Sequence, residues 1–461
     1  MPDSTRKGIL SCSGCNSPDG CRHDPSKRRE NSLDWFIAEA LRGHYVGMTS
    51  TYAFQSFNAY NLQMSMNASE LGPGPMPFAH FVVKVASRCN IKCTYCYVYE
   101  QADRTWITQP RRMSDAIELA TIARIGEYLA ELGNQQALVI LHGGEPLLYG
   151  AQRIERFAER LRAECGRRGV DAKLALQTNG TMVDDAWLDV FDRNGIHVGL
   201  SLDGPPDVHD AKRRDKVGAG TYERTAEGLR RLLSSTGDRG SPPAVTAVID
   251  PAARPRDVVE HFLGLGVEHV DFQLPDVNHD SYPHAQWPLG TFGAWLIELY
   301  EELRRIDRPM RVRSIELLVG LLLGAPYGGD ILGPRSFGTL VIDTDGDYHA
   351  HDALKATFDG ATITGASVLN EPIRSLVTHP MVLAHTDKAT AASADCLECP
   401  LFSVCGGGLV AHRYSASRQY DNRSVYCTDL AMFIRHVEDA LTQWRGDRID
   451  AVSAGASVAT R

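Results

Sequence analysis

Residues 81–100 read FVVKVASRCNIKCTYCYVYE, an apolar run that leads into three closely spaced cysteines. The first part, FVVKVAS (81–87), predicts a buried strand, because short apolar and β-branched runs are typical of strands covered on both faces. Cys89, Cys93 and Cys96 follow it in a C-x3-C-x2-C arrangement. This stretch therefore predicts a strand that ends in a thiolate-rich loop.

Further strand-like segments follow, and an amphipathic, helix-like segment lies between each of them and the next. Strands that alternate with helices predict a parallel sheet with right-handed crossovers. Six such units are too few for an eight-stranded barrel, so we expect a partial (β/α)6 barrel with its functional groups at the carboxyl ends of the strands. The predicted strands are 81–87, 137–142, 172–178, 196–201, 244–249 and 269–274, and the predicted helices are 114–132 (with Ser114 as N-cap), 151–164, 184–193, 221–235 and 256–265.

The remaining chain predicts a domain order around this barrel. We expect an N-terminal extension, partly disordered, over 1–76, the (β/α)6 core over 77–284 and a helical connector over 285–329. A loop-rich, cysteine-bearing domain follows over 330–446, with a final helix at about 428–445. The small, polar residues of 447–461 predict a disordered tail.

Charge and hydropathy exclude several classes of protein. The 461 residues contain 48 Lys and Arg against 57 Asp and Glu, a net charge of −9, which argues against nucleic acid or an anionic membrane as a partner. The most apolar stretch, LLVGLLLGAP (317–326), is far shorter than the roughly 20 residues of a membrane span. The N-terminal residues show no apolar signal region, so we expect a cytoplasmic protein.

Cys89, Cys93 and Cys96 are candidate ligands of an iron–sulfur cluster. Three thiolates on one loop can hold three irons of a [4Fe–4S] cube and leave the fourth open to a cofactor or substrate. A zinc site or a set of buried free cysteines would explain the same spacing. The later strand ends favour the cluster, because HGGEP (142–146), QTNG (177–180) and SLDG (201–204) place glycines, carboxylates and a hydroxyl where a small zwitterion would bind.

Together these motifs resemble the radical S-adenosylmethionine (radical SAM) superfamily over about residues 80–275. In that superfamily the amino and carboxylate groups of S-adenosylmethionine bind the open iron, and one electron cleaves the cofactor to a 5′-deoxyadenosyl radical. The resemblance implies a set of contacts to the cofactor. They are Gly143, Gly144 and Glu145 for the methionine amino group, Ser201 and Asp203 for its carboxylate or the ribose, Arg213 or equally Arg214 for the carboxylate, Asn179 beside them, and Tyr95 and Leu274 near the adenine.

A second cysteine group, Cys396, Cys399, Cys405 and Cys427, has C-x2-C-x5-C spacing before its last member. Four thiolates suit a structural zinc ion as well as a [4Fe–4S] cluster. The segment resembles the SPASM extension of peptide-modifying radical enzymes, whose full pattern has two auxiliary clusters. Here His351 and Leu409 stand where that pattern has cysteines. The resemblance therefore implies one auxiliary [4Fe–4S] cluster, bound entirely by protein and suited to electron transfer.

The flanking residues resemble FxsB-type maturases over about 77–440, on ILHGGEPLL, LQTNG, CGGGLVAHRY and the ending YDNRSVYC (420–427), with Tyr420 where Phe is usual. That resemblance implies a ribosomally made precursor peptide, an aromatic ring carbon joined to a β-carbon in a three-residue cyclophane, and a reducing partner such as a ferredoxin or flavodoxin. Thioether formation and oxidation of Ser or Cys, as in sulfatase maturation, are alternatives. A non-catalytic, cysteine-rich metal or electron carrier is a third, which the strand-end motifs disfavour.

Asp352 is the candidate catalytic base. The matching Asp of the related sulfatase-maturing enzymes serves as the base, and an ionised carboxylate here would take the proton released after radical chemistry. An N-cap of the short segment 353–356 is an equally good interpretation of Asp352. Cys12, Cys15, Cys21 and His23 are interpreted as part of a mobile tail rather than as a third metal site, and Cys165 as a packing residue.

Overall fold

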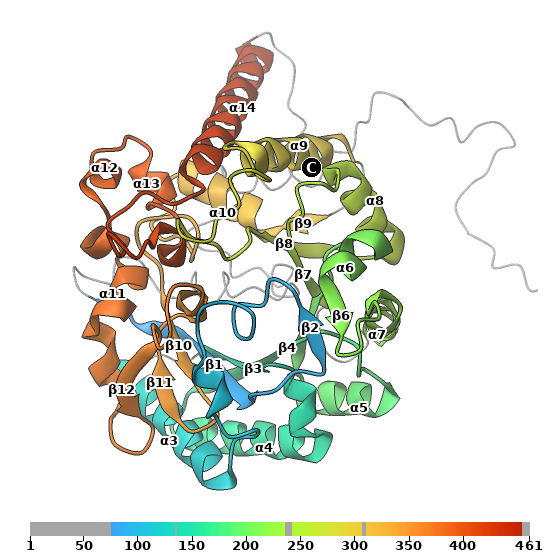
Figure 1. Ribbon diagram of the computed structural model, residues 1–461, viewed down its shortest axis with the longest axis vertical. Helices are drawn as coiled ribbons and strands as arrows, with labels where there is room; N and C mark the ends of the chain where they lie inside the picture. Colours follow the sequence, from blue (N-terminus) through green and yellow to red (C-terminus); the bar gives the residue numbers. More distant parts are fainter. Residues whose placement is uncertain (1–74, 134–135, 236–241, 307–309, 454–461) are drawn as a thin grey trace, which may run out of the picture.

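The computed structural model describes residues 75–133, 136–235, 242–306 and 310–453 of the chain (Figure 1). At its centre lies a ten-stranded, largely parallel sheet with the strand order β12-β11-β10-β1-β3-β4-β5-β7-β8-β9. The predicted parallel core is confirmed. Its six strands are β1 (Phe78–Ala86), β3 (Gln136–Gly143), β4 (Asp171–Thr178), β5 (His197–Ser201), β7 (Ala244–Val248) and β8 (His269–Gln273).

The helices that link these strands lie around the outside of the curved sheet (Figure 1). Their ends follow the local sequence signals. The Ser114 hydroxyl accepts a hydrogen bond from the Ile117 amide at 3.3 Å, so it caps α3 as predicted, and Gly133 ends that helix with a φ of 61°. These helices are α3 (Asp115–Leu132), α4 (Ala151–Arg167), α5 (Asp185–Asn194), α7 (Tyr222–Ser234) and α8 (Pro255–Leu265).

The sheet continues past the predicted strands at both edges. β10 (Gly338–Ile342) pairs in parallel with β1, and β11 (Asp347–His349) and β12 (Ile363–Ser367) add antiparallel strands beyond it. At the other edge β9 (Arg311–Val312) pairs with β8. The sequence predicted only helices and loops in these regions, because they lack the regular alternation of strands with helices that marks the parallel core.

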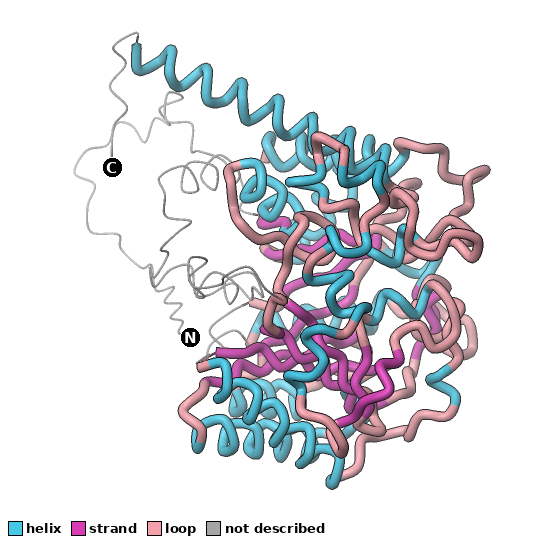
Figure 2. The backbone as a smooth tube through the Cα atoms, turned by 90° about the vertical axis from the view of Figure 1, so that its left-hand side faces the viewer, coloured by secondary structure: helices cyan, strands magenta, loops and turns pink. Residues whose placement is uncertain are grey.

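Most of the remaining elements are helices in the C-terminal part of the chain. α14 (Cys427–Ser453) projects from the body of the molecule (Figure 2). The predicted end at about 445 is too early, because the helix runs to Ser453 through a stretch that contains no proline. Residues 447–453 of the predicted tail therefore belong to the helix, and 454–461 lie outside the described residues. The other elements are α9 (Thr291–Arg305), α10 (Arg313–Leu322), β2 (Ile91–Cys93), α6 (Pro206–Lys212), β6 (Arg213–Asp215), α11 (Pro380–Thr386), α12 (Ala394–Leu397), α13 (Phe402–Cys405) and 3-10 turns at Thr105–Ile107, Pro146–Tyr149, Asp352–Ala356, Ile373–Thr378, Lys388–Ala391 and Val410–Arg413.

One continuous hydrophobic core joins the parallel strands to the C-terminal helices. It includes Phe81 on β1, Phe157 on α4, Leu318 on α10 and Phe433 on α14. Cys165 is 1% exposed within it, which confirms its interpretation as a packing residue. The β/α core and the cysteine-bearing segment therefore pack on one another around shared apolar side chains.

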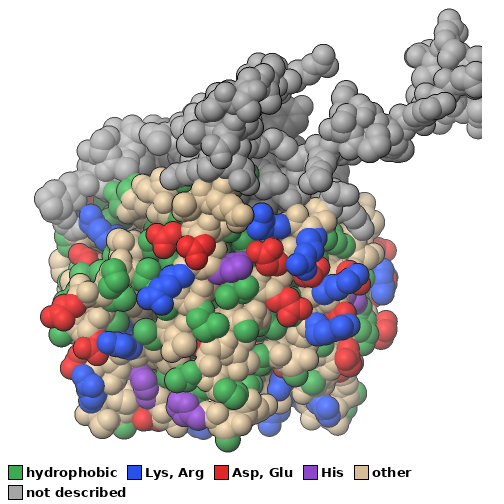
Figure 3. Space-filling view, turned by 90° about the horizontal axis from the view of Figure 1, so that it is seen from above, with side chains coloured by type: hydrophobic (Ala, Val, Ile, Leu, Met, Phe, Trp, Pro, Cys, Tyr) green, Lys and Arg blue, Asp and Glu red, His purple; other side chains and the backbone are tan. Residues whose placement is uncertain are grey.

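The surface carries both signs of charge. On the face that Figure 3 shows, acidic and basic side chains alternate over the described part of the chain. Among the described residues, no helix is long and apolar enough to cross a membrane.

Candidate active site

The first cysteine group lies on the loop that follows β1. Within this loop β2 pairs with β6, and the pairing sets Cys93 opposite Arg213, whose Nη1 lies 3.9 Å from the Cys93 Sγ. Burial raises the pKa of Cys89 to about 12 and that of Cys96 to about 11. Coordination to iron deprotonates thiols outright, so a bound cluster would supply the positive charge that these buried thiolates need.

Tyr95, Asp203 and Arg213 form one hydrogen-bonded group beside this loop. The Asp203 Oδ2 accepts hydrogen bonds from the Tyr95 hydroxyl at 2.6 Å and from the Arg213 Nε at 3.0 Å, and the guanidinium lies over the Tyr95 ring, 5.3 Å from its centroid. Arg214 was an equal candidate from the sequence, but it is exposed and its Nε donates to the Asp210 carbonyl. Arg213 is therefore the arginine that the fold brings to this group.

The end of β3 approaches the cysteine-bearing segment very closely. A Cβ atom at Gly143 would lie 1.9 Å from the Ala86 carbonyl oxygen, and one at Gly144 would lie 2.0 Å from the Tyr99 hydroxyl. Gly143 also has a φ of +140°, a conformation that side chains rarely allow. Both positions therefore require glycine, and the bare backbone of this strand end lies against the chain that leads into the cysteine loop.

Glu145 makes more protein contacts than the sequence suggested. Its carboxylate is fully buried, and it accepts hydrogen bonds from the Thr178 hydroxyl at 2.8 Å, the Leu147 amide at 3.1 Å and the Asn179 amide at 2.9 Å. Burial raises its pKa to about 7 against the effect of these bonds. Since a carboxylate has about four acceptor positions, one remains for an ammonium group. Glu145 thus ties the ends of β3 and β4 together, and its contact with a ligand stays a prediction.

The other predicted cofactor residues lie at the same edge of the sheet. The Asn179 Nδ2 lies 3.7 Å from the Cys89 Sγ, and the Ser201 hydroxyl accepts a hydrogen bond from the Gln177 Nε2 at 3.0 Å. Leu274 is buried directly after β8. The fold therefore gathers the glycines, carboxylates and thiols that an iron-bound amino acid would need, while the individual contacts remain predictions.

Asp352 lies in a buried ion pair that the sequence did not reveal. Its Oδ1 is 2.7 Å from the Nζ of Lys84, which stands near the end of β1 opposite His142 of β3. Burial alone would raise the pKa of Asp352, but the charges of Lys84 and Lys355 hold it at about 2. The second oxygen, Oδ2, is buried and has no hydrogen-bond partner among the residues that the structure describes. Asp352 is therefore an ionised carboxylate with one free acceptor atom at the carboxyl edge of the sheet.

The ion pair belongs to a larger buried network. The Lys84 Nζ also lies 3.5 Å from the Asp343 Oδ2, and the Lys355 Nζ lies 2.9 Å from the Asp103 Oδ2. A narrow gap is lined by Lys84, Asp343 and Lys355 together with Gly143 and Gly144 of the predicted cofactor site. The candidate base is joined to this gap through its ion pair with Lys84.

The alternative interpretation of Asp352 as an N-cap is wrong. The 3-10 turn Asp352–Ala356 is capped by His351, whose Nδ1 accepts a hydrogen bond from the Ala353 amide at 3.2 Å. The His351 Nε2 lies 3.3 Å from the Asp330 Oδ2. Because the preceding histidine caps the turn, the Asp352 carboxylate is left to pair with Lys84.

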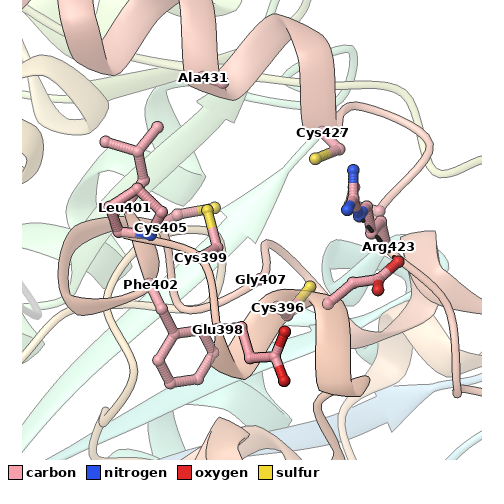
Figure 4. Close-up of a pocket in the computed structure, with 13 residues that line it drawn as sticks. Cys396, Glu398, Cys399, Leu401, Phe402, Cys405, Gly407, Arg423, Cys427 and Ala431 are labelled. Carbon is pink, nitrogen blue, oxygen red and sulfur yellow. Dashed lines mark ion pairs between the residues drawn. The ribbon is translucent and has the colours of Figure 1, made fainter.

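Cys396, Cys399, Cys405 and Cys427 surround a cavity of about 340 Å³, and Figure 4 shows their sulfur atoms turned toward it. A structural zinc ion would draw four thiolates onto one point at about 2.3 Å. In the described part of the chain, no three His, Cys, Asp or Glu groups converge on one such ion position. Thiols spaced around an open cavity fit the larger [4Fe–4S] cube instead.

The sequence analysis missed the ion pairs of Lys84 and the strands β10 and β11 that make them possible. Lys84 sits inside the apolar run FVVKVAS, and only the distant Asp352 and Asp343 give its charge a partner. The missed strands β10 and β11 deliver both carboxylates. A lysine in the middle of an otherwise buried strand was the available signal. Cys12, Cys15, Cys21 and His23 lie outside the described residues.

Comparisons with known proteins agree with this geometry. The profile of the radical SAM superfamily matches residues 83–249. The serine-type anaerobic sulfatase-maturating enzyme of Klebsiella aerogenes is 28% identical over 348 residues, which cover 74% of this chain and 82% of that protein. The cysteine-type enzyme of Clostridium perfringens (strain 13) is 34% identical over 156 residues, 33% of this chain and 41% of that protein.

Solved structures show the same fold. The structure of anSMEcpe with bound AdoMet matches with a TM-score of 0.66 at 19% identity, over 80% of this chain and 99% of that one. The same protein with AdoMet and the Cp18Cys peptide also matches with a TM-score of 0.66, at 20% identity, over 80% and 99%. Radical SAM enzymes bind a [4Fe–4S] cluster and S-adenosylmethionine, and the described residues fit both groups. This chain therefore carries the radical SAM fold, and anaerobic sulfatase-maturating enzymes are among its relatives.

Proposed function

We propose that this chain is a radical SAM oxidoreductase that oxidises the β-carbon of a residue in a peptide or protein substrate. The observation that carries the proposal is Asp352, an ionised and buried carboxylate whose partner Lys84 lines a narrow gap beside Gly143 and Gly144. The sulfatase-maturating enzyme of Klebsiella aerogenes supports it, because its 28% identity extends over 74% of this chain.

The chemistry needs one group from the cofactor and one from the chain. S-adenosylmethionine and its cluster, when bound, supply the radical that removes one hydrogen atom from the substrate. The resulting β-carbon radical of a serine must then lose one proton and one electron to become an aldehyde. Asp352 is ionised at neutral pH, and its unpartnered Oδ2 is available to accept that proton.

The sulfatase-maturing type of oxidation is better supported than the cyclophane that the sequence favoured. The curated relatives named above are serine-type and cysteine-type sulfatase-maturating enzymes, and the peptide complex among the solved structures belongs to the same group. The cyclophane remains a second candidate on the residues of its own resemblance, chiefly YDNRSVYC (420–427) and the replacement of cysteine at His351 and Leu409. Either reaction would use a precursor peptide or protein and an external reductant such as a ferredoxin or flavodoxin.

One anaerobic reaction separates the two candidates. The reduced enzyme is incubated with S-adenosylmethionine and either the Cp18Cys peptide, its Cys-to-Ser counterpart, or a peptide of equal length with an aromatic-x-x sequence. We expect 5′-deoxyadenosine and a carbonyl product that reacts with a hydrazine from the first or second peptide. A hydrazine-inert product that has lost two hydrogens, formed only from the aromatic peptide, would replace the proposal with the crosslinking reaction.

The variant Asp352→Asn tests the base. It keeps the size of the side chain and an oxygen for Lys84, so 5′-deoxyadenosine should still form while oxidised peptide falls at least about 100-fold, the usual scale for a positioned base. The matched control is Asp343→Asn, which removes a charge from the same lysine at 3.5 Å and should change product yield only a few-fold. Full oxidation by the Asp352→Asn variant would remove Asp352 from the reaction.

A further inference from the structure

Two buried cations lie beside the second cysteine group, and the proposed reaction has not yet used them. Lys388, at the start of the 3-10 turn Lys388–Ala391, and Arg413, at the end of Val410–Arg413, both have a relative exposure of 0%. Buried cations of this kind are normally paired with a carboxylate, because an uncompensated charge in a protein interior is costly.

Arg413 is held by neutral backbone groups. Its Nη2 donates to the Gly406 carbonyl at 2.7 Å and the Gly408 carbonyl at 3.3 Å, and its Nε donates to the Gly407 carbonyl at 2.9 Å. The three glycines follow Cys405 directly and have φ values of 62°, 75° and 73°, which only glycine adopts readily in succession. The loop that begins at a cluster cysteine is therefore shaped around this guanidinium.

Lys388 is held in a similar way. Its Nζ donates to the Gly329 carbonyl at 3.0 Å. Asp330, the neighbouring carboxylate, is already paired with His351. Within the described ranges, neither the Lys388 ammonium nor the Arg413 guanidinium has a carboxylate within 4.0 Å. The direct contacts of both cations are therefore backbone carbonyls, and Asp330 acts on Lys388 from beyond ion-pair distance. Burial lowers the pKa of Lys388 to about 7.

The thiolates of the second group are the negative charges that remain. Cys405 acts electrostatically on Lys388, and both Cys396 and Cys405 act on Arg413. A [4Fe–4S] cluster with four thiolates carries a net negative charge, which grows by one on reduction, and nearby charges are among the factors that set its potential. Buried cations therefore stabilise the reduced form more than the oxidised form.

The first cysteine group has a different environment. There the nearby cation, Arg213, is neutralised by Asp203 at 3.0 Å. At the second group the carboxylates that line the cavity, Asp395 and Glu398, are exposed, and Asp395 pairs with Arg423, so neither neutralises the two buried cations. Because its buried cations are not neutralised in this way, the cluster at the second group should be reduced more easily than the cluster at the first.

We propose that Lys388 and Arg413 raise the midpoint potential of the auxiliary cluster, so that it takes the electron that the substrate releases. The destination of that electron rests on the proposed function. An oxidised [4Fe–4S] cluster held by Cys396, Cys399, Cys405 and Cys427 would take one electron from the substrate radical, Asp352 would take the proton, and the carbonyl would form. Lys388 and Arg413 touch neither substrate nor cofactor, so they act through the cluster.

The test is a redox titration of the auxiliary cluster, followed by electron paramagnetic resonance, in the full-length chain with Cys89, Cys93 and Cys96 replaced by Ala so that one cluster gives the signal. In Lys388→Gln and in Arg413→Gln, we expect the ratio of reduced to oxidised cluster at a fixed potential to fall about tenfold, a shift of about 59 mV for one electron. Arg413→Lys keeps the charge and should keep the potential while losing thermal stability.

Arg423 provides a matched control, because it lines the same cavity but its guanidinium is 58% exposed and lies 3.2 Å from Asp395. Its replacement by Gln should shift the ratio less than threefold, since solvent screens exposed charges. Unchanged ratios in both Lys388→Gln and Arg413→Gln, or equal shifts in Arg423→Gln, would overturn the proposal, as would loss of the cluster from both buried-cation variants. None of these outcomes depends on the substrate or product, so a failed proposed function would be recognised separately.

Discussion

Replacing Lys84 with methionine would test the central electrostatic contact of the site. The Lys84 ammonium lies 2.7 Å from Asp352 and 3.5 Å from Asp343, and all three side chains are at most 10% exposed. Methionine preserves the length and apolar stem of the side chain but removes the charge. The variant therefore leaves two buried carboxylates without their shared counter-charge.

The size of the effect follows from the pKa of Asp352. In the folded chain it is lowered from 3.8 to about 2, because Lys84 and Lys355 together outweigh burial. At about 1.36 kcal/mol per pKa unit, this corresponds to roughly 2–3 kcal/mol of stability at neutral pH. Removing one partner of a buried pair costs about 3–5 kcal/mol. The two values together predict a loss of about 2–5 kcal/mol.

The pH dependence has a defined sign. A carboxylate whose pKa is lower in the folded state stabilises the protein above its unfolded pKa, and this contribution is lost as the pH falls through the folded value. The stabilisation by Asp352 should therefore be complete above pH 3.8 and disappear as the pH falls toward about 2. In Lys84→Met the pKa of Asp352 rises, so this loss of stability at low pH should be absent.

Anaerobic urea unfolding of the wild type, Lys84→Met, Asp352→Asn and the double variant measures the coupling. We expect the double variant to be more stable than the sum of the single changes predicts, by at least 1 kcal/mol as a rough scale for contacting residues. Lys355→Met is the matched control, because it breaks an equally buried pair with Asp103 at 2.9 Å. It should change the pH dependence of the rate of peptide oxidation less than Lys84→Met does. Additive effects within about 0.5 kcal/mol would refute the pairing.

Three further predictions concern the clusters and the cofactor. Anaerobically reconstituted protein should hold about eight irons, and the triple replacement of the first cysteine group should leave about four; about twelve irons would reveal a third cluster. Arg213→Gln should weaken S-adenosylmethionine binding about 10–100-fold, as expected for a lost charged hydrogen bond. The control Arg214→Gln changes an exposed residue and should bind the cofactor normally. Equal affinities of the two variants by calorimetry would exclude Arg213 from the cofactor site. Because burial raises the pKa of Glu145 to about 7, the affinity for S-adenosylmethionine should increase as the pH rises through that value. The variant Glu145→Gln should abolish this increase. If the affinity of both proteins depended on pH in the same way, Glu145 would not bind the ammonium.

The parallel core could be predicted because its apolar strands alternate regularly with helices that are long enough to show their period. The apolar strands of the core and the Ser114 cap could each be predicted from a short local stretch of sequence. β10 could not, because its parallel partner β1 lies far earlier in the chain, and β11 could not, because its place in the sheet depends on pairing with β10. The same missing strands concealed the ion pairs, since Asp343 and Asp352 reach Lys84 only through this pairing.

The cofactor side of the site was more predictable than the substrate side. Its residues stand within a few positions of strand ends, so the rule that parallel strands share a functional edge brings them together without a structure. Choosing between Arg213 and Arg214 required the register of β2 against β6, which a sequence does not show. The buried role of Glu145 likewise depends on the distance between two strand ends.

The positions where the SPASM pattern expects cysteines explain how Asp352 can be held in place by protein alone. His351 caps the turn that begins at Asp352, pairs with Asp330 and stacks on His385 with ring centroids 4.9 Å apart. Because the Nδ1 atom accepts the Ala353 amide hydrogen bond, the hydrogen of the neutral His351 ring is on Nε2 and faces Asp330. Leu409 packs in an apolar cluster with Leu354, in the same turn as Asp352. A cap, a hydrogen bond to Asp330 and an apolar contact thus anchor the candidate base, so its position does not require a metal cluster at this point.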